Sequence, residues 1–424
     1  MSDVALRALE RAVRTDDTPS ARLSYALALG RAGRHDDAYR ALRPAVHDAE
    51  VRSALARSPA WNHPLADAGH TCWLDVAPLT RAPRVMWRRE TPRREDREVE
   101  ARVDGMLLAS PLGIVVNDDV MGSEHQDEAW PVVLDPETGA TRVSMPAVRG
   151  GSENRTGPWA LHTAIAGELL LGEGYWTVQA CELWTGGDRG ATWTPPTDVL
   201  ESRVLGGGAL GAEGAWTRAD RYGFYPLLSA NGRVLPAGTL SGGPCSLAAA
   251  AGAVYRREDD GELLALDAAT GVERWRTGGP WNGPWLLADA GGVIATTHGG
   301  FALFDDAGRE RWRHGDHLPR VLAPGYIVAM SPDATVTLDR TTGATRPLAS
   351  AKDPDVDQAS VAAARDVIYR ASPRDGIAAF AREGDLLWRY EIQDVQALAV
   401  LPERVYAILF DGTVLCLGPP EAVA

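Results

Sequence analysis

The sequence predicts a mainly β protein that carries a small α-helical segment at its N-terminus. Residues 1–58 are rich in alanine, and their apolar residues recur at the i, i+3, i+4 spacing of a helix. After residue 60 the pattern changes to short apolar runs of period two, separated by Gly, Asp, Asn and Pro. A turn-and-strand unit also recurs along this second part. We therefore divide the chain into a helical segment (1–58), a linker (59–81) and a β region (82–424).

The helical segment begins a helix at "TPSARLSYALALGRAG", where Thr18 is the expected cap and Pro19 the first helical residue. The residues expected on its packed face are Leu23, Ala26, Leu27 and Gly30. A second helix, "HDDAYRALRPAV", presents Ala38, Ala41, Leu42 and Ala45 at the same spacing. Together they resemble one tetratricopeptide unit, whereas a freestanding solenoid needs about three. A packed helical cap and a peptide-binding groove are both compatible with this segment.

The β region repeats a unit that is best preserved in "GELLALDAATGVERWRTGG", residues 261–279. It reads as a strand ending at Asp267, a turn with Thr270 and Gly271, and a second strand carrying Trp275. Related units place the same residue types at Asp135 and Gly139, at Asp339 and Gly343, at Gly308 and Trp312, and at Gly384 and Trp388.

Each residue type in this unit has a physical role. The Asp side chain accepts hydrogen bonds from the backbone of its own turn, and the Thr hydroxyl does likewise. The Gly supplies the positive φ that the turn requires. The Trp is a large apolar body that can cover a neighbouring sheet, with about 2 to 3 kcal/mol of burial if fully covered. We interpret these residues as structural.

A second motif precedes each copy, as in "GPWALHTAIAGELLLGEG" (157–174) and "GPWLLADAGGVIATTHGG" (283–300). In all, eight such units follow one another roughly 33 to 50 residues apart, each long enough for about four short strands. This arrangement predicts an eight-bladed β-propeller of four-stranded antiparallel blades. The last unit (405–418) lacks its turn and Trp strand, and residues 82–90 with Trp87 offer the missing strand. We expect this N-terminal strand to close the ring, which removes both sheet edges.

The sequence "ELLALDAATGVERW" resembles the repeat of pyrroloquinoline-quinone (PQQ) type propellers, the family of quinoprotein alcohol dehydrogenases. The same repeat occurs in non-enzymatic relatives, including an outer-membrane assembly lipoprotein. The resemblance covers roughly residues 82–418 and implies the eight-bladed fold. It implies the enzymes' cofactor only weakly, because those enzymes carry two adjacent cysteines against the quinone. Here Cys72, Cys181, Cys245 and Cys416 lie far apart. We expect free thiols, no c-type haem and no bound cofactor.

Composition excludes several partner classes. The formal net charge is −14, whereas binding to nucleic acid or to anionic lipid needs clustered cationic charge. No window reaches the ~18 apolar residues of a membrane helix, and "MSDVALRALERAVR" lacks the apolar run of a signal peptide. These observations predict a cytoplasmic, monomeric protein that contacts neither nucleic acid nor membrane.

Two loops carry residue types that could hold a cation. "RHGDHLP" contains His314, Asp316 and His317 at the junction of two units, where propeller loops meet the axial opening. "MGSEHQDEAW" contains Glu124, His125 and Asp127, although it lacks the glycine and the spacing of an EF-hand loop. For each loop, a solvated polar loop is the alternative. No catalytic motif of the GxSxG, P-loop or HExxH kind is present.

The leading hypothesis is a non-catalytic scaffold of a bacterial multi-protein system, in which the helical segment assists docking to another protein. The alternative is a propeller whose central funnel binds a small ligand or a metal ion, as an enzyme or a sensor. A PQQ-dependent dehydrogenase is the weakest reading, because the adjacent cysteines are missing. The sequence leaves the partner unidentified, since a fold does not imply a function.

Overall fold

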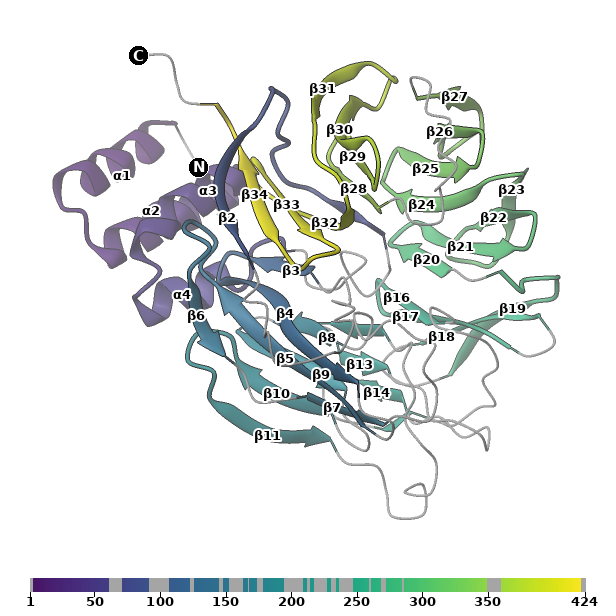
Figure 1. Cartoon of the computed structure of the whole chain (residues 1–424), viewed down its shortest axis with the longest axis horizontal. Coiled ribbons are helices and arrows are strands. Elements are labelled where there is room, and N and C mark those ends of the chain that lie inside the picture. The colour runs from purple at the N-terminus through teal and green to yellow at the C-terminus, as the bar shows by residue number, and fades with distance from the viewer. Residues whose placement is uncertain are drawn as a thin grey trace.

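A computed structural model describes residues 3–60, 71–90, 107–122, 126–144, 148–151, 163–166, 168–173, 178–193, 209–211, 214–216, 227–229, 234–235, 247–258, 261–267, 272–283, 286–348 and 360–420. Short helices at the N-terminus lie beside a body built from separate antiparallel sheets (Figure 1). The protein is therefore mainly β with a small helical part, as the sequence predicts.

The helical part contains α1 (Asp3–Thr15), α2 (Pro19–Arg31), α3 (His35–Leu42), a 3-10 turn (Arg43–Ala45) and α4 (Ala49–Leu55). The Thr18 hydroxyl caps α2 by accepting a hydrogen bond from the Ala21 amide at 3.3 Å. Gly33 has φ +74° just after α2, which is the left-handed conformation that ends many helices.

The packed face of α2 differs from the expected one. Leu27 is 49% exposed, whereas Ala28 and Leu29 are buried. The reason is that α2 is covered from two directions. Leu6 of α1 packs on Ala28 and Leu29, while Ala26 belongs to a different core cluster that continues into the sheets. A single amphipathic stripe does not describe a helix with two packed sides.

The described strands form eight sheets, and apart from β1 (Trp73–Leu74), β2 (Arg84–Arg89) and β7 (Val148–Gly151) the strands of each sheet follow one another in chain order as an antiparallel meander. The first sheet contains β3 (Leu107–Ser110), β4 (Gly113–Gly122), β5 (Gln126–Leu134) and β6 (Thr141–Ser144), and β7 (Val148–Gly151) pairs with β5. The second contains β8 (Thr163–Ala166), β9 (Leu169–Glu173), β10 (Val178–Glu182) and β11 (Asp188–Trp193). The third contains β12 (Ala209–Gly211), β13 (Gly214–Trp216), β14 (Leu227–Ser229) and β15 (Val234–Leu235). The fourth contains β16 (Leu247–Ala250), β17 (Ala253–Arg257), β18 (Leu263–Asp267) and β19 (Glu273–Thr277).

The later sheets have the same plan. The fifth contains β20 (Leu286–Asp289), β21 (Gly292–Thr297), β22 (Gly300–Phe304) and β23 (Glu310–Gly315). The sixth contains β24 (Leu318–Leu322), β25 (Tyr326–Ser331), β26 (Ala334–Asp339) and β27 (Thr345–Pro347). The seventh contains β28 (Ser360–Ala364), β29 (Val367–Ser372), β30 (Gly376–Ala381) and β31 (Leu386–Tyr390). The eighth contains β32 (Val395–Leu401), β33 (Arg404–Leu409) and β34 (Val414–Gly418).

Two N-terminal strands join sheets formed by the C-terminal part of the chain. Strand β2 (Arg84–Arg89) pairs antiparallel with β34, placing Trp87 opposite Cys416, and so supplies the fourth strand of the eighth sheet. Strand β1 (Trp73–Leu74) pairs parallel with β28. Part of the stretch expected to be a linker therefore packs against the seventh sheet. Figure 1 shows β2 lying beside β34, a strand that is far from it in the sequence.

The sheets pack face to face through nearly continuous apolar strands. All residues of β22, β29 and β34 are buried, because neighbouring sheets cover both of their faces. The outer strands β19 and β23 alternate instead between exposed and half-buried residues. The first strand of each sheet contacts the first strand of the next, and β32 contacts β3.

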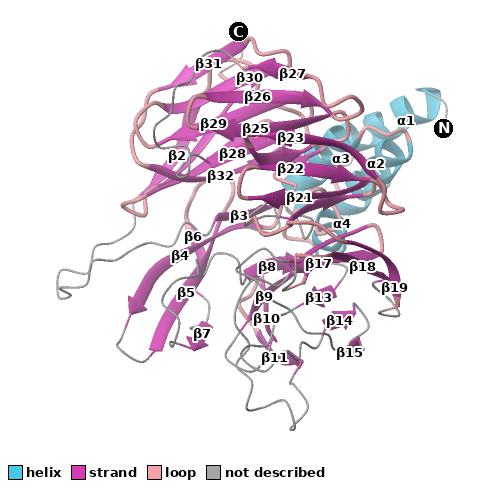
Figure 2. Ribbon diagram, turned by 90° about the vertical axis from the view of Figure 1, so that its right-hand side faces the viewer, coloured by secondary structure: helices cyan, strands magenta, loops and turns pink. Residues whose placement is uncertain are grey.

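The helical part belongs to the same core. Tyr39, Leu42, Val51 and Leu55 are buried in one cluster with Leu108, Leu112, Val115, Val133, Ile165, Leu170 and Leu183 of the first two sheets. Figure 2 shows the helices gathered at one side of the stacked strands. The helices therefore cover apolar residues that would otherwise face solvent at this side.

Candidate functional site

The repeated turn is a local hydrogen-bonded structure, seen most completely at Asp339. Its Oδ1 accepts from the backbone amides of Thr341 and Thr342, at 3.0 and 2.8 Å, and from the Thr342 hydroxyl at 2.9 Å. The amide and hydroxyl of Thr342 hold the pKa of the Asp339 carboxyl below its ordinary value, because they stabilise the charged form. Gly343 completes the turn with φ +70°. The turn at Asp135 and Thr138 has the same hydrogen bonds.

Each described repeat Trp of the outer strands reaches beyond its own sheet. The indole Nε1 of Trp275 in the fourth sheet donates to the Asp306 carbonyl of the fifth sheet's turn at 2.9 Å. Trp312 of the fifth sheet donates in the same way to the Arg340 carbonyl of the sixth sheet's turn, at 2.9 Å. Trp87 of the eighth sheet donates to the Pro136 carbonyl of the first sheet's turn, also at 2.9 Å. Trp388 donates to the Leu79 carbonyl at 2.8 Å.

The turn glycines lie against these rings. A Cβ atom at Gly308 would lie 2.6 Å from Cδ2 of Trp275, and one at Gly139 would lie 2.5 Å from Cε3 of Trp87. The turn glycine is thus required for its φ and also for the room it leaves to the indole of the preceding sheet. Gly384 packs instead on the Pro347 carbonyl at a junction without a Trp. Thr270 and Gly271 lie outside the described residues.

A network of ion pairs joins the helical part to the sheets. The Arg365 guanidinium binds Asp36 of α3 at 2.6 Å and Asp75 near β1 at 2.9 Å. Arg40 of α3 binds Glu403 at 2.8 Å. Together with the apolar cluster, these contacts hold α3 and α4 in one orientation relative to the sheets.

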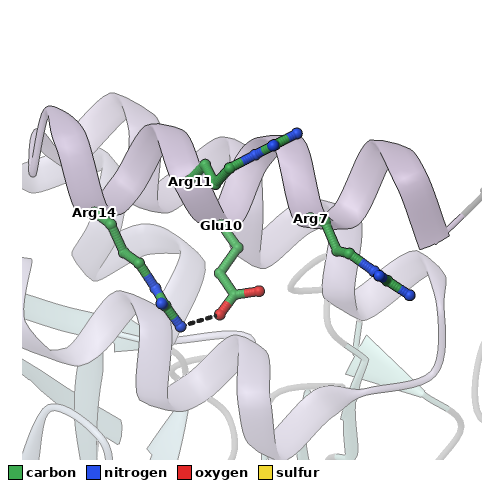
Figure 3. A pocket seen from close by; sticks show the side chains of 4 residues that line it. All are labelled: Arg7, Glu10, Arg11 and Arg14. Atoms are coloured by element: carbon green, nitrogen blue, oxygen red, sulfur yellow. Dashed lines mark hydrogen bonds and ion pairs between the residues drawn. The ribbon is translucent and has the colours of Figure 1, made fainter.

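Helix α1 carries an arginine-rich face on which Arg7, Arg11 and Arg14 are exposed. Arg7, Glu10, Arg11 and Arg14 line a shallow pocket, in which Arg14 pairs with Glu10 at 2.6 Å (Figure 3). Leu6, on another side of this helix, packs on α2. The sequence signal for this face is the spacing of arginines in "ALRALERAVR", which analysis of the apolar residues alone does not detect.

The structure brings together two of the three residues predicted in "RHGDHLP". Nε2 of His314 lies 3.1 Å from Nδ1 of His317, and the ring centroids are 5.0 Å apart. His314 is the second-last residue of β23 and His317 directly precedes β24, so the pair spans the junction of the fifth and sixth sheets. Burial and the neighbouring His317 lower the pKa of His314, although Asp316 acts in the opposite direction.

The second predicted cation loop is placed only in part. Asp127 lies on β5, whereas Glu124 and His125 lie outside the described residues. Within the part of the chain that the structure describes, no group of three or more His, Cys, Asp and Glu residues is arranged to hold a metal ion. Neither predicted loop therefore forms a three-residue metal site there.

The described donors do not fit a quinone with its calcium ion. No described cluster of carboxylates and imidazoles could hold the ion. Cys72 and Cys416 are buried, no two of the four cysteines are adjacent in the sequence, and Cys245 lies outside the described residues. Burial raises the pKa of the Cys416 thiol to about 11, which keeps it protonated and unreactive at neutral pH. We assign no quinone chemistry to these residues.

Comparison with known proteins identifies the repeat. Residues 208–418 match the PQQ_2 family model, described as outer membrane protein assembly factor BamB. No curated protein matches the sequence. Among the described residues, no helix is both long and apolar enough to cross a membrane.

Solved structures share the fold at low sequence identity. The quinohemoprotein alcohol dehydrogenase ADHIIG from Pseudomonas putida HK5 superposes with a TM-score of 0.56 at 10% identity, covering 89% of this chain and 83% of that one. The quinohemoprotein alcohol dehydrogenase from Comamonas testosteroni superposes with a TM-score of 0.54 at 13% identity, covering 88% of this chain and 84% of that one. The computationally designed Ika8 protein superposes with a TM-score of 0.51 at 14% identity, covering 70% of this chain and 95% of that one. At these identities the likeness concerns the fold alone.

Proposed function

We propose that this PQQ-like β-propeller repeat protein is a non-catalytic scaffold that binds another protein, with its helical part contributing to docking. The observation that carries the proposal is the placement of α1. Helices α3 and α4 are held on the sheets by the apolar cluster and the ion pairs of Arg365 and Arg40. Helix α1 packs on α2, and its Arg7, Arg11 and Arg14 are exposed. A firmly held support with an exposed charged face suits recognition of a partner.

The proposed scaffold is an eight-bladed ring closed by the N-terminal strand. Three observations support closure: β2 completes the eighth sheet, β32 contacts β3, and Trp87 of the eighth sheet donates to Pro136 in the first. Such a ring leaves only short, protected sheet edges. It has turn-lined faces on which a partner can bind. The matching family model is described as an assembly factor. This description supports a role for the protein in a multi-protein system.

The chemistry of the α1 face indicates the class of partner. Three arginines and one glutamate line the pocket, giving a local positive charge on a chain whose net charge is −14. An acidic segment of a partner protein would find complementary charge there, and the arginine forks can bind its carboxylates. We therefore propose an acidic protein segment as the docking element.

Affinity purification of the full chain from its native host, with and without the triple substitution R7E/R11E/R14E, tests this function. Quantitative mass spectrometry should show proteins retained by the wild type and lost by the variant, while circular dichroism stays unchanged. A matched variant, R389E, changes an exposed arginine on β31 and should retain the same proteins. Equal retention by all three chains would exclude α1 as the docking face, and no retained protein at all would contradict the scaffold function.

The alternative function is a propeller that binds a small ligand. A thermal-shift screen of the full chain distinguishes it from the scaffold function. PQQ with Ca²⁺, sugars and nucleotides are the probes, since any ligand that binds the native state raises the Tm. A specific shift with one of them, together with an empty affinity purification, would favour the alternative. The cytoplasmic location and the monomeric state remain predictions, to be tested by cell fractionation and by light scattering.

A further inference from the structure

Two imidazoles face each other at the junction of the fifth and sixth sheets. Nε2 of His314 and Nδ1 of His317 are 3.1 Å apart. Nδ1 of His317 is also 3.4 Å from the Gly315 carbonyl oxygen. With Zn–N bonds of about 2.0 to 2.1 Å, two imidazole nitrogens on one tetrahedral ion lie roughly 3.3 to 3.4 Å apart. The observed separation is close to that spacing.

The backbone between the two histidines keeps them in place. Asp316 has φ +64°, a left-handed conformation that is uncommon for a residue other than glycine. Its amide donates to the Gly299 carbonyl at 2.9 Å, which ties the turn to the neighbouring β21–β22 connection. The His314 ring also packs on Phe301, with ring centroids 5.6 Å apart. A bound ion takes the place of the hydrogen bond between the two rings.

The surroundings of His317 limit how tightly an ion can be held. The outer nitrogen of His317, Nε2, is buried and has no hydrogen-bond partner among the described residues. Without a second group to orient this ring, affinity should be moderate rather than that of a structural zinc site.

We propose that His314 and His317 form a two-imidazole binding site for a divalent transition-metal ion of the zinc and copper class. The two nitrogens hold the ion, and water molecules complete its coordination. Imidazole favours Zn²⁺, Cu²⁺ and Ni²⁺ over Ca²⁺ and Mg²⁺, which prefer oxygen ligands. Because His314 belongs to the fifth sheet and His317 leads into the sixth, a bound ion links the two sheets and stabilises their junction.

Isothermal titration of the tag-free full chain with Zn²⁺ tests the site, and the visible spectrum of the Cu²⁺ form reports nitrogen ligation. The wild type should bind one ion that His317→Ala and His314→Gln each weaken by roughly tenfold or more. Zn²⁺ should also raise the Tm of the wild type but not that of either variant. His35→Ala removes an exposed histidine at the start of α3 and serves as the matched control.

The outcomes are distinguishable from those of the scaffold function. Unchanged Zn²⁺ binding in His317→Ala, or a Cu²⁺ spectrum without nitrogen ligands, would overturn the proposal. Loss of binding in His35→Ala as well would assign the ion to another part of the chain and overturn it too. None of these results bears on partner docking at α1, which uses different residues.

Discussion

Trp275 of the fourth sheet and Asp306 of the fifth are joined by a hydrogen bond of 2.9 Å from the indole to a backbone carbonyl. The indole also lies against Gly308 of the same turn. The turn and the Trp of one repeat therefore belong to two different contacts: the turn meets the preceding sheet, and the Trp meets the following one. This relationship explains why the sequence repeats both features together, and it makes specific predictions about stability.

Substituting Gly308 by Ala should destabilise the protein by about 1 to 3 kcal/mol. The residue has φ +78°, a conformation in which a side chain is strained. The new Cβ would also meet the Trp275 ring at 2.6 Å. Urea unfolding measures the effect. Gly278→Ala is the control, because no atom lies within 4 Å of its Cβ position, and a similar loss in that variant would refute the explanation.

Substituting Trp87 by Ala should cost about 3 to 5 kcal/mol, the range for a large buried aromatic. Trp87 is 8% exposed, contacts Tyr406 and donates to the Pro136 carbonyl of the first sheet. The loss should appear in the thermal unfolding of the full chain. Leu386→Ala, at a residue that is 49% exposed, should change stability by less than about 0.5 kcal/mol. A mild effect of the Trp87 substitution would argue against its role between the eighth and first sheets.

Substituting Arg365 by Ala should loosen the helical part without unfolding the sheets. This side chain joins Asp36 of α3 to Asp75 near β1. Because the pairs are partly exposed, their contribution is about 1 kcal/mol or less and should fall as salt is added. Hydrogen exchange followed by mass spectrometry should show faster exchange in α3 and α4 only. Arg389→Ala, an exposed substitution on β31, should leave these helices unchanged, and equal protection in both variants would contradict the prediction.

The turn carboxylates predict a loss of stability in acid. Hydrogen bonds from Thr342 lower the pKa of Asp339 in the folded state. A group with a depressed folded pKa contributes stability above its unfolded pKa, and the contribution is lost as the pH falls through the folded value. Asp339→Asn should therefore lower the urea midpoint at pH 7, and the difference from wild type should shrink below about pH 4. Asp333→Asn, at an exposed residue, is the control, and its difference in urea midpoint from wild type should not change with pH in this way. If the difference for Asp339→Asn stayed the same below about pH 4, the prediction would be contradicted.

The helical part shows where sequence reasoning was incomplete. Thr18 and Pro19 correctly indicated the start of α2, because a cap depends on residues next to one another. The packed face of α2 was predicted wrongly at Leu27, which is exposed. Its two-sided burial depends on α1 and on the sheets, which no periodicity within α2 reveals. The likeness to a tetratricopeptide unit remains a resemblance.

The candidate sites, too, could be predicted only in part from the sequence. His314 and His317 could be singled out in the sequence because they are three residues apart and of ligand type. The sequence could not show that Asp316 stays apart from the two histidines. Only the turn geometry, with the positive φ of Asp316, decides which side chains come together. The arginines of α1 became a candidate surface only once Leu6 was seen to pack on α2 and leave them outside.

The sequence by itself determined the repeated turn, because its hydrogen bonds join atoms within five residues and depend only on the types Asp, Thr and Gly. It also determined the class of fold, because the same turn and Trp strand recur along the β region. Only the tertiary structure decided which Trp meets which turn, that β1 pairs with β28, and that α3 and α4 cover the first two sheets. These contacts join segments that lie far apart in the chain, so shape and burial in the folded protein select them, and no local pattern encodes them.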